Sequence, residues 1–438
     1  MKKSLINAVS LIIMSSLMLS ACSSGGNSDR TNREDDDDET PVSFNTSIDY
    51  EELEQCSFDE EDMNADYRSY SFELMNQVAS SSDPDTNIMV SPASVMFALD
   101  MCASGANGNT LRQMTDLFSE DADPLEQQAF ASQFMRQIND SEGVDFHSAN
   151  SVWTNESRMS SGLNPDFQDY IEEYFDAEAV LEEFDGNTVN EINSWVEEHT
   201  SGMIQEVLDE LPARTVAVLV NAISFEGQWA TPYEDYQVNE FDFRSASGDS
   251  IPMDMLCETS YSYYETDLAT GFMKSYEGGR YAFLVMLPTD ESINANEFLS
   301  GFTADDYNDF INSCSYDYDV YTRLPEFEYD YDMSLVPVLE SMGMTDAFDE
   351  NLADFTGIGI ADSGNNIYIS QVLHKTHIEL DREGTRAAAS TVIIMEDAAC
   401  APVVEDMIRY VYCDRPFAYA IVDTSNMNPV FIGTFNGQ

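Results

Sequence analysis

The chain has 438 residues, of which 82 are Asp or Glu and 18 are Lys or Arg, so its formal net charge is -64. A polyanion of this kind repels nucleic acid, which excludes nucleic acid as a partner. Hydrophobic residues make up 43% and aromatic residues 11% of the chain, which is enough apolar material for a packed core. The composition therefore predicts a folded protein, and its halophilic-like acidity indicates a surface solvated in salt.

The first 21 residues have the form of an export signal. Lys2 and Lys3 precede an apolar run, Leu5 to Leu19, that is too short for a spanning helix. The ending Leu-Ser-Ala-Cys resembles the lipobox of bacterial lipoproteins, in which the cysteine, here Cys22, becomes the lipidated first residue. We therefore expect a lipid-anchored protein on the cell envelope, at the outer membrane or cell surface, facing an extracellular or periplasmic space. An ordinary cleaved signal with an incidental Cys22 is the alternative.

Residues 22–63 are rich in Ser, Gly, Asn and acid, with a run of acidic side chains over 34–39. This composition predicts a solvated, disordered tether. The acidic run lacks the glycine-turned spacing of a calcium loop, so we expect no calcium site there. Six cysteines remain once Cys22 is assigned to lipid, and their spacing selects none of the 15 possible pairings. They are Cys56, Cys102, Cys257, Cys314, Cys400 and Cys413.

The remaining residues, 64–438, alternate helical and strand-like patterns. Residues 64–80 have helical spacing, Ser91-Pro92 opens a second helix, and residues 191–196 belong to a third. Further on, β-rich or alternating runs bounded by turn residues predict strands. These runs are 217–225, 281–287, 314–321, 327–332, 410–422 and 430–435. Helices early and strands late indicate an α+β domain.

The usual catalytic patterns are absent from the sequence. There is no Gly-x-Ser-x-Gly, Gly-x-Gly-x-x-Gly, phosphate-binding Gly/Lys loop or His-Glu-x-x-His. His374 and His377 lie three residues apart, and on a strand such residues face opposite sides, so they would not share a metal. We expect no enzyme, no cofactor and no metal.

An ordered series of short motifs resembles the serpin family from about Tyr67 to Gly433. The early motifs are Asn87 to Ser94, Gly105-Ala106, Thr110 and Ala149-Asn150; the middle motifs are Ile192 to Val196, Val220 to Trp229, Leu287-Pro288 and Leu324 to Phe327; the late motifs are Ala353 to Phe355, His374-Lys375, Glu383 to Thr391 and Asp414 to Phe417. Each motif is weak alone, but their common order is specific.

The resemblance implies a single serpin-type domain over 64–438, with helices packed on three β-sheets and an exposed reactive loop at about 382–406. It also implies inhibition of a serine protease, or of a cysteine protease, by suicide-substrate trapping. The protease cuts the loop, and the cut loop then inserts as a new strand into the central sheet. A serpin-fold lipoprotein that binds without trapping is the alternative, and an acidic solute-binding lipoprotein is a third reading that the motif order disfavours. We expect a monomer.

A loop that becomes a central strand needs inward side chains that are small or apolar. Counting from the hinge residue after Gly384, the inward set is Thr385, Ala387, Ala389, Thr391, Ile393 and Met395. The outward set is Arg386, Ala388, Ser390, Val392, Ile394 and Glu396. Both charges of this stretch therefore face outward, which favours insertion; a merely flexible small-residue loop is the other reading.

The resemblance also assigns residues that control insertion. The polar cluster beneath the opening of the sheet is matched by Asn87, Ser91, Ser94, Asn221 and His374, and Trp229 matches the tryptophan at the upper entry. Family members usually have Glu where this chain has Arg382 and Arg386, and Lys where it has Glu326. We interpret Arg382 and Glu326 as the family's ion pair with its charges exchanged.

The reactive bond follows from the family's spacing of fourteen residues beyond the hinge glycine. This spacing gives Ala398-Ala399, and an alanine bait favours an elastase-like or subtilisin-like protease. Met395, Asp397 and Cys400 remain alternative bait residues, because the loop is longer than usual. A disulfide between Cys400 and Cys413 would permit insertion after cleavage at Ala398 and would block it after cleavage at Cys400.

Overall fold

The computed structural model describes residues 44, 46–120, 122–159, 161–211, 215–362, 366–385 and 407–437. Within these residues the strands form three β-sheets, and the segment Ser43–Gln438 is one compact unit. The α+β prediction with three sheets is confirmed.

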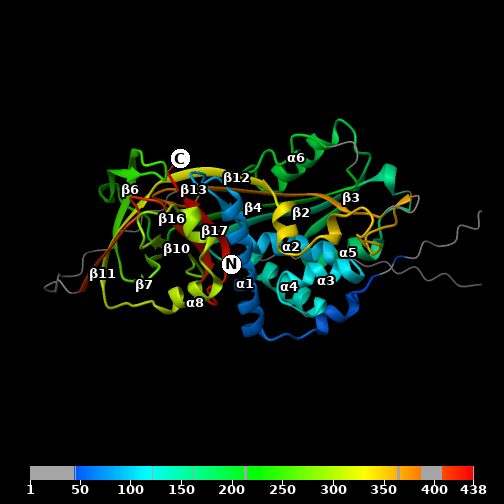
Figure 1. Ribbon diagram of the computed structural model, residues 1–438, viewed down its shortest axis with the longest axis horizontal. Helices are drawn as coiled ribbons and strands as arrows, with labels where there is room; N and C mark the ends of the chain where they lie inside the picture. The colour runs from blue at the N-terminus through cyan, green and yellow to red at the C-terminus, as the bar shows by residue number, and fades with distance from the viewer. Residues whose placement is uncertain are drawn as a thin grey trace, which may run out of the picture. The chain divides into compact units, whose positions relative to one another are not determined.

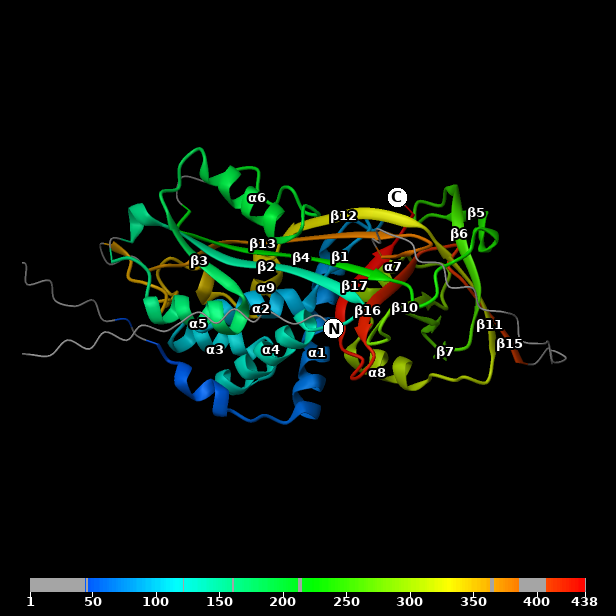
Figure 2. The same ribbon diagram turned by 180° about the vertical axis from the view of Figure 1, so that it is seen from behind.

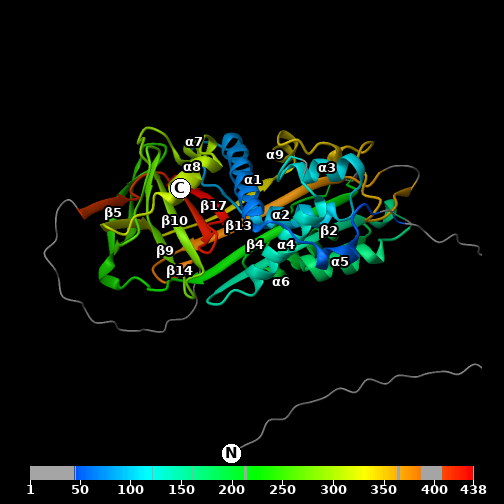
Figure 3. The same cartoon turned by 90° about the horizontal axis from the view of Figure 1, so that it is seen from below.

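The sheet that carries the candidate site has six strands, in the order β12-β13-β14-β4-β2-β3. We call it the large sheet because three of its strands, β13, β4 and β2, have 12 residues each. Its strands are β12 Phe327–Ser334, β13 Ile369–Leu380, β14 Gly384–Thr385, β4 Ala217–Gln228, β2 Val144–Asn155 and β3 Ala177–Glu182. Neighbouring strands β13 and β4 are parallel, whereas β14 is antiparallel to both of them. Figure 3 shows the short β14 beside the ends of β13 and β4.

Two further sheets complete the β-structure of the described residues. The first has the order β1-β17-β16-β10-β8-β7, with β9 also paired to β10. Its strands are β1 Met89–Val90, β17 Pro429–Phe435, β16 Phe417–Asp423, β10 Tyr281–Pro288, β8 Ala269–Gly271, β7 Tyr264–Glu265 and β9 Met273–Ser275. The second has the order β15-β11-β6-β5, and its strands are β15 Ile408–Tyr412, β11 Asp319–Pro325, β6 Ser250–Ser260 and β5 Val238–Arg244.

Most helices begin at a residue that caps them. Ser91 caps the second helix through its hydroxyl, which accepts from the Ser94 backbone N–H, and Pro92 follows at the first helical position. The α-helices are α1 Glu60–Ser81, α2 Pro92–Ala103, α3 Gly108–Asp116, α4 Pro124–Asn139, α5 Pro165–Phe175, α6 Thr188–His199, α7 Ala295–Ser300, α8 Ala304–Asn312 and α9 Val336–Ser341. Short 3-10 helices are η1 Tyr50–Gln55, η2 Glu156–Arg158, η3 Asp235–Gln237 and η4 Asp346–Phe348.

The large sheet has helices on both faces (Figures 1 and 2). On its inner face lies α2, every residue of which is buried, in contact with β4, β2 and β17. On its outer face lies α6, whose Ile192 and Val196 share a small core with Val218 and Val220 of β4. Alternate strand residues face opposite sides, so packing against α2 on one face and α6 on the other fixes the face that each side chain of β4 and β13 occupies.

Three boundaries differ from the sequence predictions. Folded structure reaches back beyond residue 64, since Ile48 and Leu53 are buried and α1 begins at Glu60; the predicted tether over 22–63 therefore extends too far. The run 410–422 forms two strands, β15 and β16, in different sheets, because Asp414-Arg415-Pro416 interrupts it. Only the end of 314–321 is a strand, beginning at Asp319.

The cysteines within the described residues are free thiols: Cys56, Cys102, Cys257, Cys314 and Cys413. Cys22 and Cys400 lie outside the described part of the chain, so the structure leaves their predicted roles open. Among the described helices, none combines the length and the apolar composition that crossing a membrane requires.

Candidate functional site

The candidate site is the seam between β13 and β4 and the entry at its upper end. The two strands pair directly from Ile369 opposite Ala217 to Thr376 opposite Ile223. Above this point β14 separates them, with Thr385 opposite both Leu380 and Gly227. The seam is therefore closed below and already occupied by two residues at its top.

Gly384 and Thr385 fit this position for different reasons. A Cβ on Gly384 would lie 2.2 Å from the Gly227 carbonyl oxygen, so only glycine lets the backbones approach this closely. The side chain of Thr385 is buried, and its hydroxyl lies 2.7 Å from the hydroxyl of Tyr276. In this structure the side chain of Thr385 therefore faces the interior.

The turn that leads into β14 is held by Asp381. Its carboxylate accepts from the backbone N–H groups of Glu383 at 2.7 Å and Gly384 at 3.1 Å. Its own backbone N–H donates to the Gly384 carbonyl at 2.9 Å. The sequence reasoning missed Asp381, although Asp followed by Gly three residues later is a typical turn signal.

Trp229, directly after β4, lies at the entry. It is buried, its indole N–H donates to the Asp381 carbonyl, and its backbone N–H donates to the Glu383 carbonyl, both at 2.9 Å. Its ring stacks on Tyr276 with centroids 4.6 Å apart. Tyr276 therefore touches both Trp229 and Thr385, which makes it a residue of the entry that the motifs did not mark.

A buried lysine, Lys274, lies close to the rings of Trp229 and Tyr233. Lys274 Nζ lies 4.0 Å from the ring centroid of Tyr233 and 2.8 Å from Glu258 Oε2. Burial lowers the pKa of Lys274, and the negative charge of Glu258 opposes that shift. Tyr233 in turn donates its backbone N–H to the Arg382 carbonyl at 2.9 Å, so this pair supports the hinge from below.

Arg382 and Glu326 are paired, as the exchanged-charge interpretation requires. Arg382 Nε lies 3.5 Å from Glu326 Oε1, which also accepts from the Arg382 backbone N–H at 3.1 Å. The guanidinium makes a second ion pair with Asp235 at 2.9 Å. Burial raises the pKa of Glu326, and Arg382 opposes that shift. The three side chains form a clamp that joins the residue between β11 and β12, the hinge turn and η3.

Below the entry, His374 and Asn221 face each other across the seam. His374 Nδ1 donates to Asn221 Oδ1 at 2.8 Å, and Nε2 accepts from the Ser91 backbone N–H at 3.2 Å. Burial lowers the pKa of His374 to about 3, so the imidazole is neutral. The Asn221 amide donates to the Ser94 carbonyl at 2.8 Å.

The structure adds one residue to the predicted polar cluster and gives one contact of Asn87 outside it. Asn150 belongs to it, because its Oδ1 accepts from the Asn221 amide at 2.7 Å. Asn87 bonds to the Asn436 backbone N–H at 2.7 Å, on the side of β17. The structure thus brings Ser91, Ser94 and His374 together with Asn221, and places this contact of Asn87 apart from them.

The rest of the predicted loop lies outside the described residues. This holds for the hinge residues Arg386, Ala387, Ala388, Ala389, Ser390 and Thr391, for the predicted reactive bond Ala398-Ala399, and for the lipidation residue Cys22. The described residues form a closed seam with an occupied entry, and its buried polar groups pair with one another.

The fold and this seam are those of one family. A family model described as Serpin (serine protease inhibitor) matches residues 65–437. The chain belongs to the serpin family, whose members are protease inhibitors and not enzymes.

Individual relatives come from ticks and from archaea. The chain is 29% identical to Iripin-8 of Ixodes ricinus over 363 residues, which cover 81% of this chain and 89% of Iripin-8. It is 28% identical to a serpin-like protein of Thermococcus kodakarensis over 370 residues, with 83% of each chain covered. Among solved structures, native tengpin, a thermophilic serpin, matches at 33% identity with a TM-score of 0.80, covering 91% of this chain and 100% of tengpin.

We predict that the His374→Gln variant loses a specific pH dependence. Below pH 6.5 the unfolded chain binds a proton that neutral His374 excludes in the folded chain. The folded pKa is depressed, so the contribution of His374 is lost as pH falls from about 6.5 towards about 3. The difference in unfolding free energy between wild type and variant should therefore change by about 1.4 kcal/mol per pH unit in this window. Urea unfolding at several pH values measures this difference in unfolding free energy. A difference that does not change with pH would contradict a neutral, buried His374. His199→Gln, on the exposed end of α6, is the control.

The clamp predicts non-additive substitutions. Arg382→Glu places a third carboxylate beside Glu326 and Asp235, and Glu326→Lys places a cation beside Arg382. The double variant should lose less stability than the sum of the two single variants, by about 1 kcal/mol for this partly exposed pair. Thermal unfolding of the four proteins gives the coupling. Arg244→Glu, which alters an exposed pair with Glu291, is the matched control. Strictly additive losses would show that the clamp is incidental.

Proposed function

We propose that the chain inhibits serine-type endopeptidases as a suicide substrate. The protease cuts the reactive loop and forms an acyl-enzyme, and the cut loop inserts between β13 and β4 with the protease attached. The observation that carries this proposal is β14: two hinge residues already lie between the strands, antiparallel to both. The chain also matches tengpin in its native state with a higher TM-score, 0.80, than in its latent state, 0.72.

The register of β14 supports continued insertion. Extending it by one residue would bring Arg386 between Glu379 of β13 and Glu226 of β4. Alternation along the strands puts this position on the outer face of the sheet, where the charge needs no burial. The cation at residue 386, where the family usually has Glu, would then have acidic neighbours on both sides. This chain's departure from the family pattern is therefore compatible with insertion.

The predicted reactive bond Ala398-Ala399 favours an elastase-like or subtilisin-like target with a small specificity pocket. Met395, Asp397 and Cys400 remain alternative bait residues. The mass of the C-terminal fragment released by the protease identifies the bond directly.

We predict that wild type forms an SDS-stable complex with at least one of a panel of elastase-like and subtilisin-like proteases, and that Thr385→Arg abolishes this complex. Thr385 is 1% exposed and bonded to Tyr276. A buried, unpaired guanidinium at this point would prevent β14 from docking and block insertion. The variant should be cut as an ordinary substrate, without the gain in thermal stability that insertion gives.

Thr385→Ser, which keeps the hydroxyl, is the control and should retain the complex. Cleavage of wild type without any complex or any gain in thermal stability would overturn inhibition. The serpin-fold protein would then be a binding lipoprotein, the alternative that the sequence left open.

We also propose that lipid on Cys22 anchors the protein to the cell envelope, because Leu-Ser-Ala-Cys follows an apolar run with two lysines before it. Expressed as the full chain in a bacterial host, wild type should partition into the detergent phase of a phase-separating detergent. Cys22→Ser should move it to the aqueous phase, since one or more acyl chains are lost. Equal partitioning of both proteins would contradict the anchor.

A further inference from the structure

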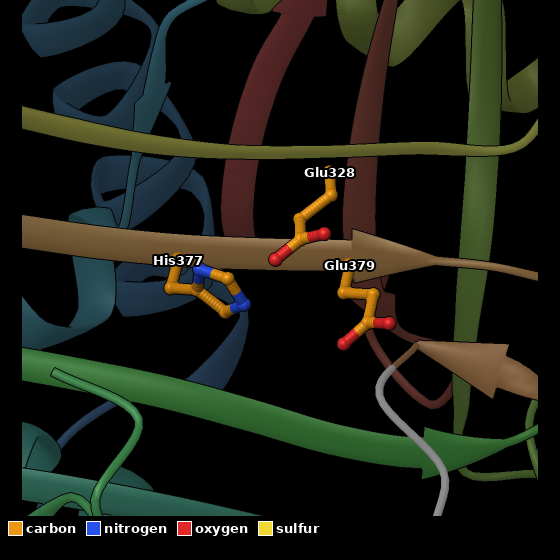
Figure 4. Close-up of side chains that lie close together, drawn as sticks. All are labelled: Glu328, His377 and Glu379. Carbon is orange, nitrogen blue, oxygen red and sulfur yellow. The ribbon is translucent and has the colours of Figure 1, made fainter.

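Three side chains converge on the outer face of the large sheet, beside the seam but not in it. Glu328 of β12 and His377 and Glu379 of β13 each bring one oxygen or nitrogen atom to within 4.8 Å of the others. Figure 4 shows the imidazole and both carboxylates turned toward one another. His377 and Glu379 are half-buried and Glu328 is exposed, so the group is open to solvent on one side.

The two carboxylates oppose each other in a way that needs explanation. Glu328 and Glu379 are direct partners in the antiparallel register of β12 and β13. Like charges directly opposite in a sheet destabilise it. Among the described residues, neither carboxylate has a cationic partner within 4 Å. A bound cation would convert this repulsion into attraction.

His377 is held as a metal-binding histidine is held. Its Nδ1 lies 2.9 Å from Asp330 Oδ1, and Asp330 is its own register partner on β12. An Nδ1–H that donates to this carboxylate leaves the lone pair of Nε2 available. A carboxylate that fixes the tautomer and orientation of a ligating imidazole in this way recurs in metal sites.

We propose that His377 Nε2 and the carboxylates of Glu328 and Glu379 bind one divalent first-row transition metal ion, with Zn²⁺ as the fitting case. One imidazole and two carboxylates suit zinc, which also accepts water in a fourth position. Calcium and magnesium fit less well, because they take six or more oxygen ligands and avoid imidazole. Asp330 is a positioning residue that holds the ring.

The ion would link β12 to β13, the two strands on one side of the seam. Because its ligands lie on one side only, binding would not lock β13 to β4. The site therefore stiffens one edge of the entry without bridging the seam. This consequence is independent of whether the chain traps proteases.

The test is Zn²⁺ binding to the native, uncleaved protein after treatment with chelator, measured by calorimetry at 0.15 M and 1 M NaCl. High salt suppresses diffuse binding to an acidic surface. One Zn²⁺ should bind per chain at both salt concentrations. Affinity should fall at least tenfold in His377→Ala and in Glu328→Gln, and about tenfold in Asp330→Asn. His147→Ala and Asp332→Asn, which change other groups on this face, should bind as wild type.

A second readout separates binding from folding. Without metal, Glu328→Gln should raise the melting temperature, because it removes the repulsion with Glu379; with Zn²⁺, only wild type should gain. Co²⁺ should give a visible absorption band that His377→Ala lacks. Three results would overturn the site. They are loss of Zn²⁺ binding at 1 M NaCl, unchanged binding in His377→Ala, and displacement of Zn²⁺ by an equal concentration of Ca²⁺.

Discussion

The structure depends on one parallel strand pair, β13 with β4, and on the buried hydrogen bond of His374 with Asn221 that crosses it. Parallel pairing is slightly less stable per residue than antiparallel pairing. A strand that enters in the direction of β14 replaces one parallel contact by two antiparallel contacts. The sheet therefore gains stability when such a strand enters the seam, whereas the polar cluster around Asn221 resists opening because each buried donor must find a new partner.

The entry orients the hinge turn and the two residues of β14 that follow it. Asp381 fixes the turn, Trp229 binds two of its carbonyls, and Arg382 ties it to Glu326. Further insertion must break the direct pairing that begins at Thr376 and Ile223, which the clamp alone does not do. The entry thus orients the hinge, while the seam supplies the resistance. Clamp and cluster therefore lie at two different places along the seam, one at the hinge and one below it.

The sequence predicted the fold class, most elements and the residues that a motif marks, such as Trp229, Ser91 and His374. These residues are local in sequence or follow strand alternation. It did not predict Tyr276, Asn150 or Asp381, whose roles arise only when β14 and the neighbouring strands come together. It also placed the folded boundary too late, because the acidic composition near Ile48 and Leu53 conceals the two apolar side chains that pack.

The positions of His374 and His377 were predicted from a single strand, without the neighbouring strand that pairs with it. Strand alternation predicted that His374 and His377 face opposite sides of the sheet. In the structure His374 is buried in the polar cluster, and His377 lies on the outer face. The prediction of no metal rested on ligands from one strand only. Glu328 lies on β12, and the pairing of β12 with β13 brings it opposite Glu379. If both proposals hold, Glu379 has two uses: it binds the ion beside the closed seam, and after insertion it neighbours Arg386. The opposed carboxylates of Glu328 and Glu379 need a cation beside them in either state, and the net charge of -64 leaves few side chains to supply one. Cation binding and loop insertion would then compete for one carboxylate, which couples the two processes through the charge of Glu379.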